Sequence, residues 1–537
     1  MPSRLASWIL ALCIAGAHVV SAGAAPKKAP KSAAPKIDVV EASVAGLQEA
    51  MAKGKLTSKA LTAEYLARIK RIDEAGPKIN AVIEVNPDAL AIAEALDAER
   101  AKKGPRGPLH GIPVLIKDNI ATADGMQTTA GSLALVGVKP PRDAFVVEKL
   151  RAAGAVILGK TNLSEWANIR STRSTSGWSA RGGLTRNPYA LDRNTSGSSS
   201  GSAAAIAASL AAVAVGTETD GSITSPASVN GLVGVKPTLG LVSRAGIIPI
   251  AHSQDTAGPM ARSVADAAAL LTAIAGTDPR DVDTADASIK TADFTKALDA
   301  GALKGARLGV IRSQLAAPRN DLVAAEIEKA LEALRKQGAV LVDIPELPNA
   351  GKYGQSELDV LLYELKADMA AWLAEWAPGA KVKTLGDLIV FNEVNADREM
   401  PYFGQELFKL ADAKGGLDSK AYLDALAQNR RLSRAEGIDK ALVDNKVDAL
   451  IAPTGQPAWL TDFIKGDASG GGFTQAAAVA GYPHITVPAG FVRGLPVGLS
   501  FVGTAWSEAR LIALAYAFEQ ATKARRPPEY PKTLNDW

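Results

Sequence analysis

The chain has 537 residues, of which 47% are apolar and 22% charged, and this balance excludes a disordered, collagen-like or coiled-coil protein. The formal net charge is +4, but residues 1–36 hold five basic side chains and no acidic one, which leaves −1 for residues 37–537. A nearly neutral body argues against a general nucleic-acid-binding protein, because such proteins need a basic face.

The first 24 residues have the order of a signal peptide. Arg4 precedes an apolar run over Trp8–Val20, and the small residues Ala22–Ala24 follow at a cleavage position. The run is shorter than the about 20 residues of a membrane-spanning helix. Residues 25–36, rich in Pro, Lys and Ala, predict a linker. We expect export to the periplasm or the medium, no membrane span after processing, and one domain over 37–537; a buried N-terminal helix is the alternative.

Periodic apolar residues predict alternating helices and strands in the body of the chain. In chain order, the predicted elements are helices around Val44–Met51 and Leu61–Ile72, a strand at Ile112–Ile116, a helix at Phe145–Ala153, a strand at Ala155–Leu158, an alanine-rich helix at Ser202–Ala214, and strands at Val213–Val215 and Val233–Val235. Leu308–Ile311, Leu322–Gln337 and Ala339–Ile344 predict a strand–helix–strand unit. Such alternation predicts an α/β fold with a parallel or mixed sheet.

Cysteine and histidine are both scarce. Cys13 is the only cysteine, and the histidines beyond the apolar run are His110, His252 and His484. Residues 37–537 therefore have no disulfide, thiolate zinc site or cysteine nucleophile. We expect no cofactor and no metal ion, and we expect the three histidines to pack in the core or in loops.

Two short motifs match catalytic patterns in an unsuitable context. Residues 154–161 (GAVILGKT) fit the nucleotide-binding pattern G-x-x-x-x-G-K-[ST], but an apolar strand replaces the required loop of exposed N–H groups. Residues 197–201 (GSSSG) fit the hydrolase pattern G-x-S-x-G, but the polar residues 192–196 replace the core strand that must precede it. A Ser-His-Asp hydrolase could still recruit His252 or His484, so that class of enzyme stays as an alternative.

The longest polar pattern has two loops on either side of a small-residue helix. A Ser/Gly-rich loop begins at Ser196 and opens the helix, and a second loop, Gly216–Ser222 (GTETDGS), follows an apolar strand. Flexible linkers are the alternative, but strongly apolar segments flank both loops. Glycine turns and helix N-termini present free N–H groups, so the pattern indicates a site for an anion or an oxyanion.

This segment resembles the amidase signature family, whose hallmark is a GGSSGGS-type loop, a helix and a GTDTGGS-type loop. Gly107–Asn119 (GPLHGIPVLIKDN) resembles the lysine motif of that family, and Ala452–Thr454, Ala480–Pro483 and Gly494–Gly503 resemble its C-terminal elements. The resemblance runs from about Ile37 to the C-terminus. It implies a single large α/β domain, with a mixed β-sheet covered by helices, that hydrolyses carboxamides.

By motif position, the resemblance implies a Ser-Ser-Lys catalytic triad. Lys117 matches the catalytic lysine, Ser198 the bridging serine that follows a cis peptide bond, and Ser222 the nucleophile. Ser199 matches a supporting serine that helps to hold the lysine. The implied oxyanion hole consists of the backbone N–H groups of Thr219, Asp220, Gly221 and Ser222.

Five positions depart from the common loops of the family. Ser196 and Ser200 replace glycines, Glu218 replaces an aspartate, Asp220 replaces a glycine, and Thr224 stands where many members have an arginine. The implied oxyanion hole consists of backbone N–H groups, so these side-chain changes leave its donors in place. The missing arginine argues against a dicarboxylate-type substrate. The variant loops resemble most those of bacterial peptide amidases, which release ammonia from C-terminal peptide amides.

The implied chemistry is also sound from the residues alone. A serine hydroxyl is a weak nucleophile and needs a base, and a buried lysine without a carboxylate partner can be neutral and act as that base. Lys117 would draw a proton from Ser222 through Ser198, and loop N–H groups would stabilise the tetrahedral oxyanion. A surface lysine after an edge strand is the alternative for Lys117.

We therefore predict a serine amidohydrolase that acts on small-molecule or peptide amides, C-terminal peptide amides above all, through an acyl-enzyme. One alternative is an amidotransferase subunit that supplies ammonia for tRNA-dependent amidation, against which the signal peptide and Thr224 argue. A non-enzymatic binding protein is disfavoured because all three relay residues are present. The sequence leaves open the oligomeric state and whether Trp166 and Trp178 line the pocket.

Overall fold

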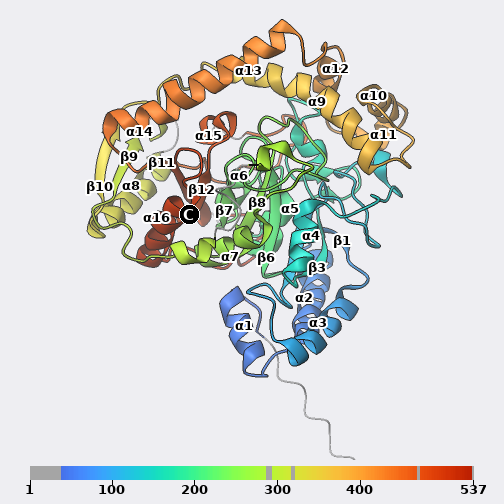
Figure 1. Ribbon diagram of the computed structural model, residues 1–537, viewed down its shortest axis with the longest axis horizontal. Coiled ribbons are helices and arrows are strands. Elements are labelled where there is room, and N and C mark those ends of the chain that lie inside the picture. The colour runs from blue at the N-terminus through green and yellow to red at the C-terminus, as the bar shows by residue number, and fades with distance from the viewer. Residues whose placement is uncertain (1–37, 286–292, 316–320, 469–471, 535–537) are drawn as a thin grey trace, which may run out of the picture. The chain divides into compact units, whose positions relative to one another are not determined.

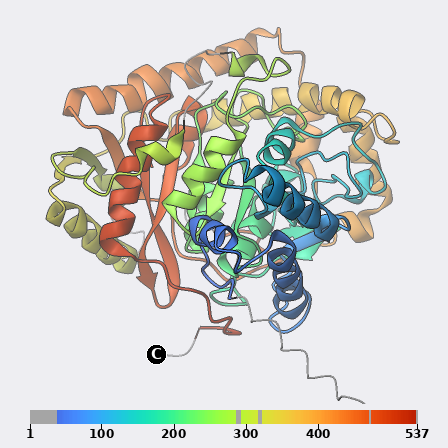
Figure 2. The same cartoon turned by 60° about the horizontal axis from the view of Figure 1, so that its bottom comes forward.

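An 11-stranded mixed β-sheet runs through the body of the protein in the order β1-β3-β2-β6-β8-β7-β12-β13-β11-β9-β10 (Figures 1 and 2). Its strands are β1 (Val82–Val85), β2 (Pro113–Lys117), β3 (Val156–Thr161), β6 (Val213–Glu218), β7 (Val233–Lys236), β8 (Thr256–Ala261), β9 (Arg307–Ile311), β10 (Val340–Ile344), β11 (Ala449–Pro453), β12 (His484–Val492) and β13 (Leu495–Val502). Parallel pairing joins β2 to β3 and β6, and β9 to β10 and β11; the other neighbours are antiparallel. The predicted α/β fold with a mixed sheet is confirmed.

The computed structural model describes residues 38–285, 293–315, 321–468 and 472–534. The signal peptide and linker that the sequence predicts lie outside these residues. Asp38–Trp537 forms a single compact unit. Among the described helices, none combines the length and the apolar character that crossing a bilayer requires.

Helices lie on both faces of the sheet (Figure 2). They are α1 (Val44–Ala52), α2 (Ser58–Arg68), α3 (Ala89–Lys103), α4 (Phe145–Ala152), α5 (Ser200–Ala207), α6 (Thr224–Val229), α7 (Val264–Ile274), α8 (Asp321–Lys336), α9 (Gly354–Trp376), α10 (Leu385–Val394), α11 (Ala396–Glu399), α12 (Glu406–Asp412), α13 (Lys420–Ser433), α14 (Asp439–Asn445), α15 (Gln475–Ala480) and α16 (Glu508–Thr522). The long helices α9 and α13 pack together along one side of the molecule (Figure 1).

Most of the predicted elements are present. The strand–helix–strand unit is β9, α8 and β10, with the two strands paired in parallel. The residues of the nucleotide-binding match at 156–161 form strand β3, as expected from their apolar character. The helix predicted over Ser202–Ala214 is wrong at its end, because α5 stops at Ala207. Arg68 bonds the carbonyl oxygens of the next two residues, at 2.8 and 2.9 Å, which satisfies the helix end by a tertiary contact.

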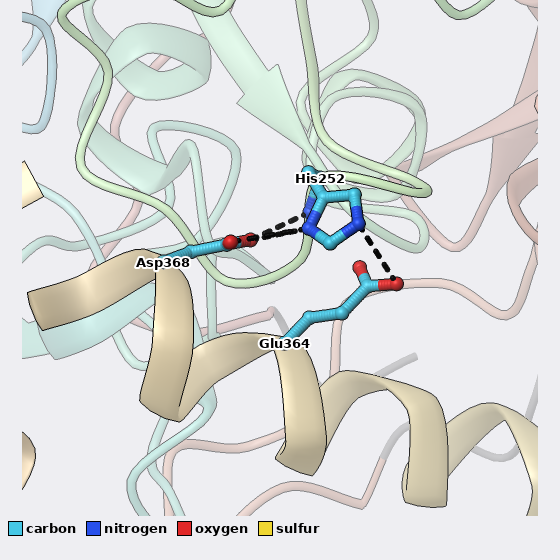
Figure 3. A group of neighbouring side chains, drawn as sticks. All are labelled: His252, Glu364 and Asp368. Atoms are coloured by element: carbon cyan, nitrogen blue, oxygen red, sulfur yellow. Dashed lines mark hydrogen bonds and ion pairs between the residues drawn. The ribbon is translucent and has the colours of Figure 1, made fainter. Parts of the chain in front are cut away.

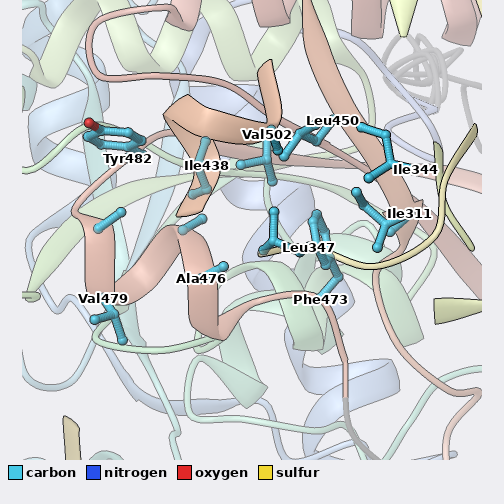
Figure 4. Close-up of a cluster of buried hydrophobic side chains, with 14 of the residues drawn as sticks. Ile311, Ile344, Leu347, Ile438, Leu450, Phe473, Ala476, Val479, Tyr482 and Val502 are labelled. Carbon is cyan, nitrogen blue, oxygen red and sulfur yellow. The ribbon is translucent and has the colours of Figure 1, made fainter. Parts of the chain in front are cut away.

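An apolar cluster fixes the segment that leads into α15. Strands β9, β10, β11 and β13 meet α15 there, through Ile311, Ile344, Leu450, Val502, Ala476 and Val479 (Figure 4). Full burial of a Val, Leu or Ile side chain contributes about 1.5–3 kcal/mol. The residues just before α15 form part of the wall of a cavity described below, so this cluster holds that wall in place.

The parallel pairing of β2 and β6 positions the candidate site. Ile116 lies opposite Val215, so the carboxyl ends of the two strands meet at the same edge of the sheet. Lys117 ends β2, and the Gly216–Ser222 loop begins within β6. Helix α5 starts from the Ser/Gly-rich loop and packs on both strands. The three segments that the sequence singles out therefore converge.

Candidate active site

Lys117 is fully buried at the end of a central strand. Its Nζ lies 2.7 Å from Ser198 Oγ, 2.8 Å from Thr217 Oγ1 and 3.3 Å from the carbonyl oxygen of Thr217. The alternative of a surface lysine after an edge strand is wrong. The contact between Lys117 and Ser198 brings together two of the three residues of the expected relay.

Burial lowers the pKa of the Lys117 amine to about 7, although the charges of Asp255 and Glu218 act in the opposite direction. A neutral amine has two N–H donors and one lone pair. The hydroxyl and carbonyl oxygens of Thr217 accept the two donors, which leaves the lone pair facing the Ser198 hydroxyl. This arrangement suits a base that takes a proton from Ser198.

The Ser/Gly-rich loop brings Ser198 and Ser199 against the nucleophile loop. The Gly197–Ser198 peptide bond is cis. The Ser199 N–H donates to the carbonyl oxygen of Ser222 at 3.1 Å, and its hydroxyl donates to the Thr217 carbonyl at 3.0 Å. Among the described residues, no hydrogen bond joins the hydroxyls of Ser198 and Ser222. The two loops are thus connected through their backbone, and Ser199 supports the residue that holds Lys117.

Ser222 lies in a tight turn between β6 and α6. The Glu218 carboxylate accepts hydrogen bonds from the N–H groups of Ile223 and Thr224, at 2.8 and 2.9 Å, and thereby caps the start of α6. Gly221 has a φ of +76°, a conformation that glycine adopts without strain. Glu218, one of the departures from the family loop, therefore shapes the turn that carries Ser222.

The turn presents backbone donors without acceptors. Within the part of the chain that the structure describes, the N–H groups of Asp220, Gly221 and Ser222 donate to no acceptor. Adjacent free N–H groups next to a serine hydroxyl are the arrangement that stabilises a tetrahedral oxyanion. Thr219, the fourth position that the resemblance implies, lies beside these three; its side chain donates to Asp255 at 2.6 Å, and no acceptor of its N–H is found among the described residues either.

Two cavities flank the nucleophile loop. One, of about 220 Å³, is lined by residues that include Asn119, Thr217, Thr219, Ile248, Trp372 and Trp376. The other, of about 380 Å³, is lined by residues that include Gly197, Asp220, Gly221, Thr454, Trp459 and Thr474. Thr219 lines the first cavity and Asp220 and Gly221 line the second, so both cavities adjoin the loop that carries Ser222.

Two of the three histidines are core residues. His110 is buried, with Nε2 3.0 Å from the carbonyl oxygen of Leu96. His484 is buried with Nε2 2.6 Å from Ser500 Oγ, and burial together with the charge of Lys236 lowers its pKa to about 3. Within the described parts of the chain, no histidine bonds either candidate serine. The structure does not assemble a Ser-His-Asp triad around them.

His252 forms a cluster with Glu364 and Asp368 of helix α9 (Figure 3). Their ligand atoms lie within 4.8 Å of one another, close enough to hold a metal ion, although the sequence predicts none. His252 Nδ1 lies 2.9 Å from Asp368, and Nε2 lies 3.5 Å from Glu364, which also accepts a hydrogen bond from Tyr422. Burial acts against the imidazolium, but bonding to Asp368 and the charge of Glu364 raise the pKa of His252. The cluster is a hydrogen-bonded contact between a loop and α9.

The sequence analysis missed the residues that orient Lys117. Asn119 Nδ2 donates to Thr217 Oγ1 at 3.0 Å, so this hydroxyl accepts from both Asn119 and Lys117. Both residues lie inside the recognised motifs, two positions after Lys117 and five before Ser222. Polar side chains next to the candidate lysine and serine are the signal that would have found them.

The tryptophans at the site are not those that the sequence singles out. Trp166 is buried against Phe408, and Trp178 packs on Tyr402 and Phe403. Among the described residues, those that line the two cavities include other tryptophans, namely Trp372, Trp376 and Trp459. The sequence gives no reason to prefer these, because chain segments far apart bring them to the cavities.

Comparison with known proteins identifies the family of this site. The Amidase family profile matches residues 60–512. The chain belongs to the amidase signature family. A probable amidase of Arabidopsis thaliana is 42% identical over 529 residues, which cover 97% of both chains. This amidase therefore matches the plant protein over nearly all of both sequences.

Two solved structures place the amidase within the family. The native peptide amidase from Stenotrophomonas maltophilia is 53% identical, with a TM-score of 0.87 over 93% of this chain and all of the other. A glutamyl-tRNA(Gln) amidotransferase subunit from Thermotoga maritima is 30% identical, with a TM-score of 0.68 over 93% and 99% of the two chains. The amidase shares its fold with both and much more of its sequence with the peptide amidase.

Proposed function

We propose that this amidase hydrolyses C-terminal carboxamides of peptides to free acids and ammonia, with Ser222 as nucleophile. The contact that carries the proposal is the 2.7 Å approach of the buried Lys117 amine to Ser198 Oγ, beside the free N–H groups of the Ser222 turn. A neutral buried lysine, a bridging hydroxyl and an oxyanion site together supply what acyl transfer from an amide requires.

The reaction follows from these positions. Neutral Lys117 accepts the Ser198 proton while Ser198 takes the Ser222 proton, and Ser222 Oγ bonds to the amide carbonyl carbon. The free N–H groups stabilise the oxyanion, at about 3–4 kcal/mol for each donor. When the C–N bond breaks, the relay returns the proton to the nitrogen and ammonia leaves. Water then attacks the acyl-enzyme by the same relay, which releases the acid and restores Ser222.

Peptide amides are the substrates that the comparisons and the loops favour. The solved relative with 53% identity is named a peptide amidase. Thr224, at the position where many family members have an arginine, bonds Glu218 and so cannot bind a substrate carboxylate. The amidotransferase role would require a partner and a mischarged tRNA, and the solved amidotransferase protein is less similar, at 30% identity.

Ammonia release from a small panel of amides tests the proposal. Purified protein should release ammonia from C-terminally amidated di- and tripeptides, leave internal peptide bonds intact, and act weakly on acetamide and glutamine. The Ser222→Ala variant is the control and should lose nearly all turnover. Glutamine turnover that exceeds peptide-amide turnover would instead support the amidotransferase role.

We also propose that the protein is exported. The support is the order of the basic, apolar and small-residue segments in the first 24 residues, followed by the linker at 25–36. Export would separate the amidase from cytoplasmic tRNA. It would give the enzyme access to peptides in the periplasm or outside the cell.

A further inference from the structure

Asp220 has a carboxylate oxygen without a partner. Within the described residues, its Oδ1 is out of contact with solvent and accepts no hydrogen bond. Leaving such an acceptor unsatisfied costs about 1–3 kcal/mol, so buried polar atoms of this kind are uncommon and call for an explanation. Asp220 also stands where the resemblance places a glycine. A side chain is therefore present, at a cost, in the loop that carries Ser222.

The unpartnered oxygen belongs to a residue of the 380 Å³ cavity. Two of the described lining residues, Asp220 and Asp467, are acidic, and none is a lysine or arginine. Asp467 is already satisfied by the N–H and hydroxyl of Ser176, at 3.0 and 2.5 Å. Asp220 is therefore the cavity carboxylate that still needs a donor.

The nearby Lys236 does not supply the missing hydrogen bond to Asp220. The Lys236 amine donates to the carbonyl oxygens of Pro237 and Tyr482, at 3.2 and 2.7 Å, rather than to a carboxylate. Its charge lowers the pKa of Asp220 from a distance, without a hydrogen bond between the two groups among those that the described residues make.

Asp220 and Glu357 are two buried carboxyl groups whose pKa values are both raised. Burial raises its pKa to about 6, against a side-chain hydrogen bond from Thr474 that lowers it. Burial, and then the charge of Asp220, raise the pKa of nearby Glu357 further, to about 8. Both Glu357 oxygens already accept hydrogen bonds, from Gln254 and Gln475 at 3.0 and 2.7 Å, so the unsatisfied acceptor of the pair is Oδ1 of Asp220.

The position of Asp220 relates this acceptor to one part of the substrate. Its backbone N–H is one of the donors without an acceptor in the Ser222 turn, and its side chain starts from the same residue. In a peptide amide, a nitrogen lies two bonds from the reacting carbonyl carbon, on its acyl side. Simple aliphatic amides have no donor there. Asp220 stands two residues before Ser222 and lines the 380 Å³ cavity, so an acyl group that enters the cavity would meet its side chain.

We propose that the Asp220 carboxylate accepts a hydrogen bond from an N–H group on the acyl side of the substrate, and so selects amino-acid and peptide amides over plain aliphatic amides. This rests on the proposed function and names the feature of the substrate that the site recognises. Two sources supply the same donor chemistry: the backbone N–H of an acylated residue and the ammonium of a free amino-acid amide. An acidic or donor-free acyl group is disfavoured.

Three substrates with one phenyl ring and one carboxamide separate the possibilities. N-acetylphenylalaninamide offers a peptide N–H, phenylalaninamide an ammonium, and 3-phenylpropanamide neither. Native enzyme should turn over one of the first two with a kcat/KM about 10–100-fold above that of 3-phenylpropanamide, the ratio expected when a buried acceptor loses its donor. Whichever of the two is preferred identifies the source of the donor.

The Asp220→Ala variant tests the assignment. Its φ is not in the left-handed region, so alanine fits the backbone. The ratio between the preferred substrate and 3-phenylpropanamide should fall to within about threefold, whatever happens to the absolute rates. In the matched control, Asp467→Asn, the ratio should stay as in the native enzyme, because Ser176 already satisfies that carboxylate.

Binding measurements cover a variant that is too slow to assay. In the Ser222→Ala background, calorimetry should show that Asp220→Ala weakens binding of the preferred amide but leaves binding of 3-phenylpropanamide unchanged. An unchanged ratio and unchanged binding in the Asp220 variants would overturn the assignment, as would equal turnover of all three amides by the native enzyme. Failure of the native enzyme to release ammonia from any of them would overturn the proposed function, and this assignment with it.

Discussion

At the scale of single residues, Lys117 is the most informative. A buried ammonium without a direct carboxylate partner costs several kcal/mol, so the protein favours the neutral amine. Its contacts are two oxygens of Thr217 and the hydroxyl of Ser198. Such a site is expensive to maintain, and the cost is explained if the amine acts as a base.

The first prediction concerns the pH dependence of turnover. Because burial lowers the pKa of Lys117 to about 7, the amine is protonated below that pH and cannot accept a proton. We expect kcat/KM to fall about tenfold for each pH unit below about 7 and to level off above it. An ammonia-release profile from pH 5 to 9 measures this. A rate that is flat across this range would argue against Lys117 as the base.

The second prediction separates catalysis from stability at the same residue. Lys117→Met should remove activity but raise the melting temperature at pH 7, because it replaces a buried amine with an apolar chain of similar length. Between pH 7 and the ordinary lysine value of 10.5, the unfolded chain binds a proton that the folded protein does not. The stability of the native enzyme therefore rises with pH over this window, and the advantage of the variant should shrink toward pH 10.

Thermal unfolding of both proteins at pH 7 and pH 10 measures this effect. Ser222→Ala is the control, since it also removes activity but changes no buried charge. A variant that is less stable than native at pH 7 would mean that the amine contributes net stability through its hydrogen bonds.

At the scale of elements, the turn between β6 and α6 is held by one side chain. Glu218 accepts from Ile223 and Thr224 and so fixes the start of the helix that follows Ser222. The sequence shows only that Glu218 replaces an aspartate. Its capping role requires the turn to fold back on the strand, which no local pattern reveals.

The third prediction tests that turn with a matched pair of variants. Glu218→Ala leaves two buried N–H groups without an acceptor and should lower both the melting temperature and kcat, the latter by about 10-fold or more. Glu218→Gln keeps the shape and removes the charge. Because that charge raises the pKa of Lys117, the Gln variant should shift the acid limb of the pH profile to lower pH. A shift to higher pH would contradict the electrostatic coupling.

Elements were predictable where their signal is local. The apolar runs of β2, β3 and β7 and the strand–helix–strand unit of β9, α8 and β10 follow from short patterns, and the two loops follow from their motifs. The end of α5 was not predictable, because Arg68 caps it from a distant segment. Lys117 and Ser198 were identified by resemblance, and only the fold shows that Thr217 contacts Lys117 and that Asn119 contacts Thr217.

At the scale of the whole molecule, the site depends on segments far apart in the chain. The cavity beside Thr217 takes Trp372 and Trp376 from α9, more than a hundred residues beyond Ser222. Asp368 and Glu364 of α9 contact His252, and both His252 and Asp368 line the same cavity (Figure 3). Composition and periodicity carry no information about such long-range contacts, which explains why the sequence indicated the loops of the site but not its walls.

The last prediction concerns the whole chain and its destination. All candidate site residues and both cavities lie within the compact unit Asp38–Trp537, so a protein that begins at Ile37 should keep the melting temperature and kcat/KM of the full chain. The same truncation removes five positive charges and should make the protein slightly acidic in isoelectric focusing.

In the native host, mass spectrometry should find a mature N-terminus at Ala25, with the protein outside the cytoplasm. Full-length protein retained in the cytosol would contradict export, while leaving the proposed chemistry untouched, because the relay and the oxyanion site do not involve the first 36 residues.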